Sequence, residues 1–318
     1  PDVLLDVLDE PLEELDFALA VRASVLRDPS WDLLDLAALE ERIDAHADGL
    51  EVGQAYSAEL AVDALADGSS SRVAAGALTL LRLGPSGHEA LAHALASLPA
   101  TALDGVRHAT LLATAADVAA LRPALEAMLR SPESTAAAAF AIERAAALGL
   151  ATSAEAIAAV LDAALPLAVT EDESAWSDDA VPALLALRAA VVSPGALDPD
   201  RLRIAATSPN PLVRRAALHA GAECGLAETL AVCRSGETAE ALEVLGAIGS
   251  AADLPRFEAA LRDDALAHGA VAGLAALGSA EVLPLLIEAM RREAVADAAA
   301  AAFAAVTGFD PGTAASSD

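Results

Sequence analysis

The segment His88-Glu89-Ala90-Leu91-Ala92-His93 contains the residue types of a zinc-protease motif, namely two histidines and a glutamate. That motif requires histidines four residues apart on one helical face, where both bind the same metal ion. In this segment the second histidine follows five residues after the first, about 140° further round a helix. The spacing argues against a metal site, and we expect no metal, no cofactor and no catalytic residue.

The polar motifs of other common enzyme classes are also missing from the sequence. It contains no glycine-rich phosphate loop, no Gly-x-Ser-x-Gly elbow and no Cys-x-x-Cys pair. Cys224 and Cys233 are too few for a disulfide framework and are predicted to be small buried apolar residues. The Ser69-Ser70-Ser71 cluster is most simply explained as the N-cap of a helix.

Arg42, His46 and Asp48 form the first polar set that we predict as a partner-binding site. They fall at the end of a helix expected over residues 34–47, which a turn at Gly49 would end. Arg42 and Asp48 are expected to brace that turn as an ion pair. His46 falls on the apolar face of the helix, which favours a buried core histidine over a ligand site.

A second polar set lies in an acidic segment near residues 170–180, where Trp176 is surrounded by carboxylates. These are Glu171, Asp172, Glu173, Asp178 and Asp179. Repulsion between like charges predicts a solvated loop here rather than a helical turn. The tryptophan either contacts a partner or packs on the edge of the neighbouring helices, and both readings remain open.

Glycines punctuate the C-terminal third of the chain at a regular interval. Gly249, Gly278 and Gly308 lie 29 and 30 residues apart, and each follows an apolar helical segment. Glycine adopts left-handed dihedrals at little cost, so each is predicted at a helix C′ position. Apolar stripes over 254–261 and 283–290 have helical spacing. The chain is therefore predicted to repeat helix, tight turn and helix, with a period of about 24–34 residues.

One segment resembles a named repeat. Residues 209–218, Pro-Asn-Pro-Leu-Val-Arg-Arg-Ala-Ala-Leu, are similar to the HEAT repeat, with a proline-bounded start and a Val-Arg-x-Ala-Ala core. Weaker forms of the pattern occur at 72–75 and 106–109. The repeats together predict an all-α fold, in which HEAT-like helical hairpins stack into an α-solenoid over residues 55–310.

Three segments of the chain differ from the repeats. Residues 1–54 are predicted to form an acidic helical cap on the first hairpin, with Pro11 opening one of its helices. The acidic segment near 170–180 is predicted to be a loop insertion in the solenoid. Residues 311–318 are predicted to form a disordered tail.

Composition supports the helical prediction and excludes several functions. Of 318 residues, 86 are Ala and 51 are Leu, while aromatics make up 3%, so an all-β fold is excluded. No uninterrupted apolar run reaches the roughly 18–20 residues that span a bilayer. The net charge of −29 argues against nucleic acid and against anionic membranes, but permits a basic protein partner. Residues 1–67 contain 18 acidic residues and 3 arginines, so much of this charge lies in the predicted cap.

The segment over residues 36–50 resembles a family signature. It reads Leu-Ala-Ala-Leu-Glu-Glu-Arg-Ile-Asp-Ala-His-Ala-Asp-Gly-Leu and is similar to the Leu-x-x-Arg-x-x-Ala-His-x-Asp-Gly-Leu signature of an uncharacterised proteobacterial HEAT-repeat family. Ala47 stands where that family usually has a bulkier apolar residue. Residues 17–22 and 302–311 are similar to other points of the family, so the resemblance covers most of the chain. Members often occur near type VI secretion clusters, and the resemblance implies an accessory role in secretion.

We expect a non-enzymatic, cytoplasmic protein-binding scaffold or adaptor whose partner has a basic surface. The resemblance implies an accessory, effector-chaperone or immunity-like protein of a secretion system. The alternative is a HEAT-fold enzyme, either a lyase or a metal-dependent enzyme. HEAT-repeat iron hydroxylases use several His-Glu pairs, whereas this sequence has one. Self-assembly through exposed repeat ends is a third possibility, and the oligomeric state stays open.

Overall fold

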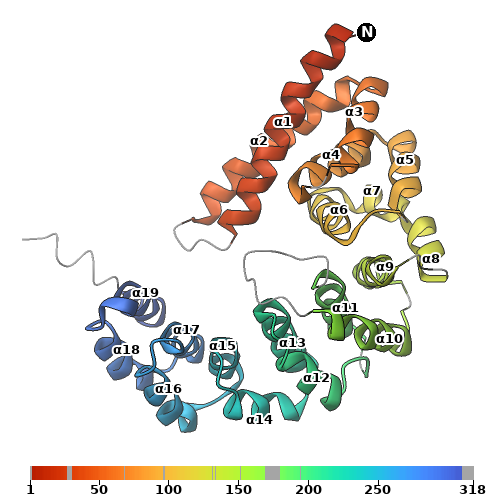
Figure 1. Cartoon of the computed structure of the whole chain (residues 1–318). Coiled ribbons are helices and arrows are strands. Elements are labelled where there is room, and N and C mark those ends of the chain that lie inside the picture. The colour runs from red at the N-terminus through yellow and green to blue at the C-terminus, as the bar shows by residue number, and fades with distance from the viewer. Residues whose placement is uncertain are drawn as a thin grey trace, which may run out of the picture. The chain divides into compact units, whose positions relative to one another are not determined.

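The computed structural model of the chain is built from helices (Figure 1). It describes residues 2–26, 31–67, 69–95, 97–130, 132, 134–150, 152–168, 180–193 and 195–309. Over these ranges no strand occurs, and the predicted all-α class is confirmed. Alanine and leucine favour helices because they lose little side-chain freedom there, and the leucines give each helix an apolar face to bury.

Contacts between residues divide the chain into two compact units. Unit 1 comprises residues 1–167 and 174–189, and unit 2 comprises residues 168–173 and 190–318. The helices of unit 1 are α1 (Asp2–Val25), α2 (Leu33–Val52), α3 (Ala55–Leu65), α4 (Ser70–Arg82), α5 (Pro85–Leu95), α6 (Ala100–Leu112), α7 (Ala115–Ala120), α8 (Arg122–Arg130), α9 (Thr135–Ala147), α10 (Ala154–Ala164) and most of α11 (Val181–Val191). Those of unit 2 are α12 (Pro199–Ala206), α13 (Pro211–Glu223), α14 (Ala227–Ser235), α15 (Ala239–Ile248), α16 (Leu254–Ala260), α17 (Ala267–Leu277), α18 (Leu283–Ala289) and α19 (Ala296–Thr307).

In unit 1, α1 and α2 occupy the range predicted as the N-terminal cap. They pack along each other, and both contact α4. Leu12 and Leu15 of α1 and Leu50 of α2 are completely buried. Leucine side chains of this size each contribute about 1.5–3 kcal/mol when buried, so the pair is held mainly by apolar contact.

Arginines join these helices to one another. Arg22 of α1 pairs with Glu40 of α2 at 2.7 Å. Arg82 of α4 donates to Asp48 of α2 at 3.2 Å and also pairs with Asp44. Basic side chains are scarce in this part of the sequence. Arg22 and Arg82 balance part of the negative charge of α2 and link it to the neighbouring helices.

Two predictions about α1 and α2 are wrong. Pro11 lies inside α1 instead of opening a helix, and Gly49 lies inside α2, which continues to Val52. Buried leucines continue the apolar face of α1 past the proline, and their burial offsets the lost backbone hydrogen bond. In α2 the buried Leu50 extends the apolar stripe past Gly49, which outweighs the roughly 1 kcal/mol that an interior glycine costs.

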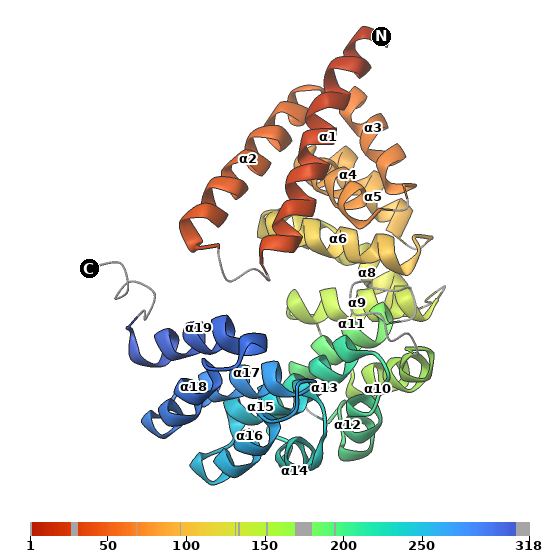
Figure 2. The ribbon, with the colours of Figure 1, turned by 60° about the vertical axis from the view of Figure 1, so that its left-hand side comes forward.

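Unit 2 contains the predicted repeat of helix, turn and helix. Helices α13, α15, α17 and α19 follow one another side by side (Figure 2), while α14, α16 and α18 pack against α15, α17 and α19. Between α15 and α17 the two backbones touch, because a Cβ atom on Gly246 would lie 1.9 Å from the carbonyl oxygen of Gly273. Small residues at such points allow helices to stack this closely.

Most of the predicted glycine turns are confirmed. Gly278 and Gly308 end α17 and α19 in the left-handed region, with φ of 62° and 71°. Besides Gly49, Gly249 is an exception, because its φ is −83°. A Cβ atom there would lie 2.4 Å from the carbonyl oxygen of Leu245, so glycine is needed at this position for space and not for a left-handed turn.

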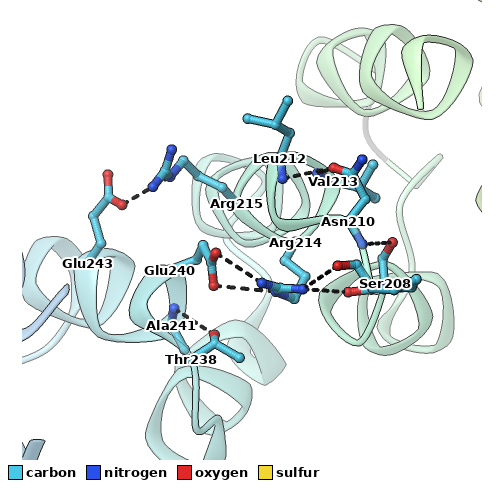
Figure 3. A network of polar contacts seen from close by, with 11 residues as sticks. Ser208, Asn210, Leu212, Val213, Arg214, Arg215, Thr238, Glu240, Ala241 and Glu243 are labelled. Atoms are coloured by element: carbon cyan, nitrogen blue, oxygen red, sulfur yellow. Dashed lines mark hydrogen bonds and ion pairs between the residues drawn. The ribbon is translucent and has the colours of Figure 1, made fainter. Parts of the chain in front are cut away.

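The HEAT-like segment begins α13 at its proline-bounded start, and Asn210 is the N-cap of the helix (Figure 3). The Asn210 side chain accepts hydrogen bonds from the backbone N–H groups of Leu212 at 2.9 Å and Val213 at 3.2 Å. Pro211 fills the first helical position, where its missing N–H is no loss. Local sequence therefore determines where this helix starts.

An ion pair connects this repeat to the next. Arg214 of α13 donates to Glu240 of α15 at 3.1 Å, and it also donates to the carbonyl oxygens of Ser208 at 2.9 Å and Pro209 at 2.8 Å (Figure 3). Burial raises the pKa of Glu240, but the hydrogen bond and charge of Arg214, together with hydrogen bonds from the Glu240 backbone and the Thr238 side chain, hold that pKa below its usual value. The pair fixes α13 against α15.

Candidate functional site

An apolar groove of about 400 Å³ lies between α1 and α2. Its lining comes from both helices and from the residue before the α2 cap: Phe17, Ala18, Val21, Trp31, Asp35, Ala38, Leu39 and Arg42. Phe17 is 61% exposed and Trp31 is 37% exposed. Leu33 and Leu34, next to Trp31 in sequence, are 83% and 79% exposed. Large apolar side chains exposed together, in contrast to single ones, are typical of an interaction surface.

The cap of α2 explains why these side chains are exposed. The Asp32 carboxylate accepts hydrogen bonds from the backbone N–H groups of Leu34 at 2.7 Å and Asp35 at 2.9 Å, which fixes where α2 begins. The face that α2 buries starts only at Leu39, a full turn later. The leucines of the first turn therefore contribute nothing to the described core and remain exposed.

One carboxylate and one guanidinium group line this groove, those of Asp35 and Arg42. Asp35 lines it, and Glu13 and Glu41 are exposed on the same two helices. The guanidinium group of Arg42 lies 4.0 Å from the Glu14 carboxylate, and both side chains are at least half exposed. The groove thus combines apolar side chains with one carboxylate and one guanidinium group, on two helices that carry further exposed carboxylates.

The three residues predicted as a set on α2 do not come together. Arg42 lines the groove, Asp48 accepts a hydrogen bond from Arg82 at 3.2 Å, and His46 is partly buried. The prediction of an ion pair between Arg42 and Asp48 is wrong. Because the helix continues through Gly49, residues six positions apart point about 120° away from each other. A partner-binding role for His46 and Asp48 stays a prediction.

The acidic set with Trp176 lies outside the described residues. It comprises Glu171, Asp172, Glu173, Trp176, Asp178 and Asp179. Its predicted role in partner binding, and the predicted disorder of residues 311–318, therefore stay predictions.

The His88 segment makes a structural contact. Nε2 of His88 donates a hydrogen bond to the carbonyl oxygen of Leu81 at 2.9 Å and lies 3.4 Å from a carboxylate oxygen of Asp117. Across the described residues, no three histidine, cysteine, aspartate or glutamate side chains gather as a metal ion would require. Cys233 is buried as predicted, whereas Cys224 is only partly buried.

A second pocket, of about 550 Å³, lies among α1, α4 and α6. Its apolar lining residues are Leu19, Ala20, Ala23, Leu26, Ala74 and Leu112. Its polar lining residues are Arg22, Ser24, Ser70, Ser71, Thr101, Asp104 and His108. The two pockets share no lining residue, so they form separate sites within unit 1.

Buried charges lie behind this second pocket. Asp104 is 2% exposed and accepts a hydrogen bond from Nε of Arg107, which is 6% exposed, at 2.9 Å. Arg107 also donates to Nε2 of His108 at 2.8 Å. Burial lowers the pKa of His108 to about 4, with Arg107, Arg188 and Arg22 adding to the effect and Asp104 opposing it. His108 is therefore neutral near physiological pH.

The charged cluster continues into the neighbouring helices. Arg144 of α9 donates to the hydroxyl of Thr110 in α6 at 2.9 Å and pairs with Glu143 beside it. In α11, burial lowers the pKa of Arg188 to about 10, so this guanidinium group still carries its charge at neutral pH. Helices α6 and α9 thus each contribute a largely buried arginine.

Sequence periodicity gives little sign of either pocket. His108 is isolated from the other histidines in sequence, and the segment at 106–109 was expected only as a weak HEAT-like pattern. The one available signal for the groove is the Leu33-Leu34 pair, which falls outside the buried stripe of its helix. Helix packing decides which helices bring the arginines together. The spacing of apolar residues along the sequence carries no information about that packing.

Comparison with protein-family models, with curated proteins and with solved structures gives no match to this chain. Among the described residues, no helix combines the length and the apolar character needed to cross a membrane.

Proposed function

We propose that this protein is a non-enzymatic binding module, and that the groove between α1 and α2 takes an amphipathic, basic segment of a partner protein. The exposed apolar side chains of Phe17 and Trp31, which both line the groove, carry this proposal. A partner helix with apolar residues on one face would cover these side chains and remove them from water.

The acidic surroundings of the groove support a basic partner. Asp35 lines the groove, Glu13 and Glu41 are exposed on its two helices, and the whole chain carries a net charge of −29. Lysines or arginines beside the apolar face of a partner would meet Asp35 and the exposed carboxylates of α1 and α2. Such complementarity mainly accelerates association and weakens as salt is added.

The wider role is proposed from the family resemblance. A protein of this kind would serve as an accessory, effector chaperone or immunity-like protein of a bacterial secretion system, acting in the cytoplasm. The competing proposal is a HEAT-fold enzyme, and metal analysis of the purified protein distinguishes the metal-dependent form of it. Stoichiometric bound metal, lost together with an activity, would favour the enzyme.

The experiment replaces Trp31 with a photo-crosslinking amino acid and irradiates the protein in an extract of its source. The expected result is one dominant crosslinked protein, joined through a segment with alternating basic and apolar residues. Purified segment is then titrated against wild-type protein and against Phe17→Ser. We expect affinity to fall at least about tenfold in the variant, since truncating a buried aromatic anchor costs more than 1 kcal/mol.

Tyr56→Ser is the matched control, because Tyr56 is a 38% exposed aromatic residue on α3 and does not line the groove. It should bind like the wild type. Equal affinity of wild type and Phe17→Ser, or an acidic crosslinked segment, would disprove the proposal. Thermal melts of both variants should match the wild type, because both side chains are already exposed.

A further inference from the structure

Helix α2 lines the groove between α1 and α2 with a single stripe of residues. The stripe consists of Asp35, Ala38, Leu39 and Arg42. Their spacing of i, i+3, i+4 and i+7 places them on one face of the helix. The two charged residues are seven positions apart, which is about 10 Å along the helix axis. Trp31 also lines the groove and precedes the α2 cap, so it belongs to the Asp35 end.

The two charged residues of the stripe differ in their partners. The Arg42 guanidinium group lies 4.0 Å from the Glu14 carboxylate of α1. Arg22, the other arginine within these two helices, pairs with Glu40 at 2.7 Å and does not line the groove. Asp35 is exposed and forms no ion pair with the described residues. The groove therefore presents one carboxylate that a partner can neutralise, at the end where α2 begins.

An indole ring and a carboxylate at the same end of a groove are suited to a cation. The Trp31 side chain is 37% exposed, and tryptophan is the aromatic residue that attracts cations most strongly. Among cationic side chains, arginine has a planar guanidinium group that stacks on an aromatic ring and donates paired hydrogen bonds to a carboxylate. The ammonium group of lysine is a strongly hydrated point charge and does neither.

We propose that the Trp31 and Asp35 end of the groove binds an arginine side chain of the partner segment. The guanidinium group stacks on Trp31 and donates hydrogen bonds to Asp35, while apolar side chains further along the segment cover Ala38 and Phe17. A second cation is disfavoured at the other end, where it would meet Arg42. This inference rests on the proposed function and specifies which end of the docked segment is basic.

Anisotropy titration of the full chain tests the proposal with three synthetic helical peptides. Each has leucines along one face, glutamines on the other, and in its first turn a single arginine, lysine or citrulline, the neutral isostere of arginine. The arginine peptide should bind at least about fivefold more tightly than the citrulline peptide, as a partly exposed cation–π contact and an ion pair together allow. It should also bind more tightly than the lysine peptide. Asp35→Asn should reduce the preference for arginine over citrulline to about twofold, which stacking alone provides.

Asp63→Asn is the matched control, because Asp63 is exposed on α3 and does not line the groove. It should keep the full preference. Trp31→Leu guards against a weakened start of α2 in Asp35→Asn, because Trp31 lies outside the helix and the change leaves every charge in place. It should melt like the wild type and also lose most of the preference.

The results separate this inference from the proposed function. Equal binding of the arginine peptide and either other peptide, or an unchanged preference in Asp35→Asn, would overturn the arginine site and leave the apolar groove as a binding site. Failure of all three peptides to bind, or equal binding by Phe17→Ser and wild type, would overturn both proposals.

Discussion

Arg107 donates a hydrogen bond to Nε2 of its sequence neighbour His108 at 2.8 Å. Arginine has donors and no acceptor, so the imidazole must accept at that nitrogen and carry its proton on Nδ1. Nδ1 in turn lies 3.8 Å from the buried carboxylate of Asp104. Protonating His108 would break the bond to Arg107 and place two cations together in a largely buried site.

This arrangement predicts that stability decreases in acid. The pKa of His108 is about 4 in the folded chain against 6.5 for a free histidine, so the unfolded chain takes up the proton first. The contribution is fully present above pH 6.5 and is lost as the pH falls toward about 4. It amounts to at most about 3 kcal/mol, at 1.36 kcal/mol for each pKa unit.

Urea unfolding of wild type and His108→Gln across this pH range measures the effect. The glutamine oxygen still accepts a hydrogen bond from Arg107 but does not titrate. The variant should therefore lose less stability on acidification than the wild type, and the remaining loss comes from carboxylates common to both proteins. Identical pH dependence of the two proteins would contradict the assignment to His108.

The pair of Arg214 and Glu240 predicts a strong asymmetry between single and double variants. Glu240 is 4% exposed, so Arg214→Met leaves a buried carboxylate without its ion-pair partner and should cost about 3 kcal/mol in unfolding free energy. Replacing both residues, as Arg214→Met with Glu240→Leu, should recover most of that loss. Chemical denaturation followed by circular dichroism measures both.

Arg203→Met is the control for charge removal in the same unit. Arg203 pairs with Asp200 at 2.8 Å, but their side chains are 60% and 80% exposed, so the change should stay within about 0.5 kcal/mol. If Arg203→Met were as destabilising as Arg214→Met, the importance of burial for the Arg214 pair would be refuted.

Two glycine-to-alanine changes should have opposite effects. At Gly246 the new Cβ atom would lie 1.9 Å from the carbonyl oxygen of Gly273, so α15 and α17 must separate, at a cost of about 3 kcal/mol. At Gly49, inside α2, no atom lies within 4 Å of the new Cβ, and the better helix former should add roughly 0.5–1 kcal/mol. Denaturant midpoints test both. A destabilised Gly49→Ala would indicate that α2 turns at this position after all.

The two cysteines should differ in reactivity. Cys233 is completely buried, and burial raises the pKa of its thiol to about 11, so little thiolate forms. Cys224 is partly exposed, although burial also raises its pKa. Ellman's reagent should modify Cys224 first and Cys233 only after unfolding. In Cys224→Ala the native protein should lose its reactive thiol, and a persistent native reaction would reverse the assignment.

Features set by a few neighbouring residues were predictable from the sequence. The start of α13 follows from Asn210 and Pro211, and the ends of α17 and α19 follow from Gly278 and Gly308. A cap or a left-handed turn depends on backbone groups within about one helical turn, so the residues that determine it lie close together in sequence. Ser69 likewise caps α4 as predicted, accepting a hydrogen bond from the Arg72 backbone N–H at 3.2 Å.

Burial was less predictable, because it depends on which helices meet. Gly49 looks like a helix end in isolation, yet the contact of Leu50 with the rest of unit 1 carries α2 past it. The same applies to Arg42, whose neighbour is Glu14 on another helix and not Asp48 on its own.

By itself, the sequence determined that this chain is all-α, where several helices begin and end, and that the N-terminal part is acidic. Only the tertiary structure decided that Phe17 and Trp31 share a groove and that the charges of Arg22, Arg107 and Arg188 lower the pKa of His108. The physical reason is range. Helix propensity and capping act over neighbouring residues, whereas desolvation and charge clustering depend on side chains that packing brings together from distant parts of the chain.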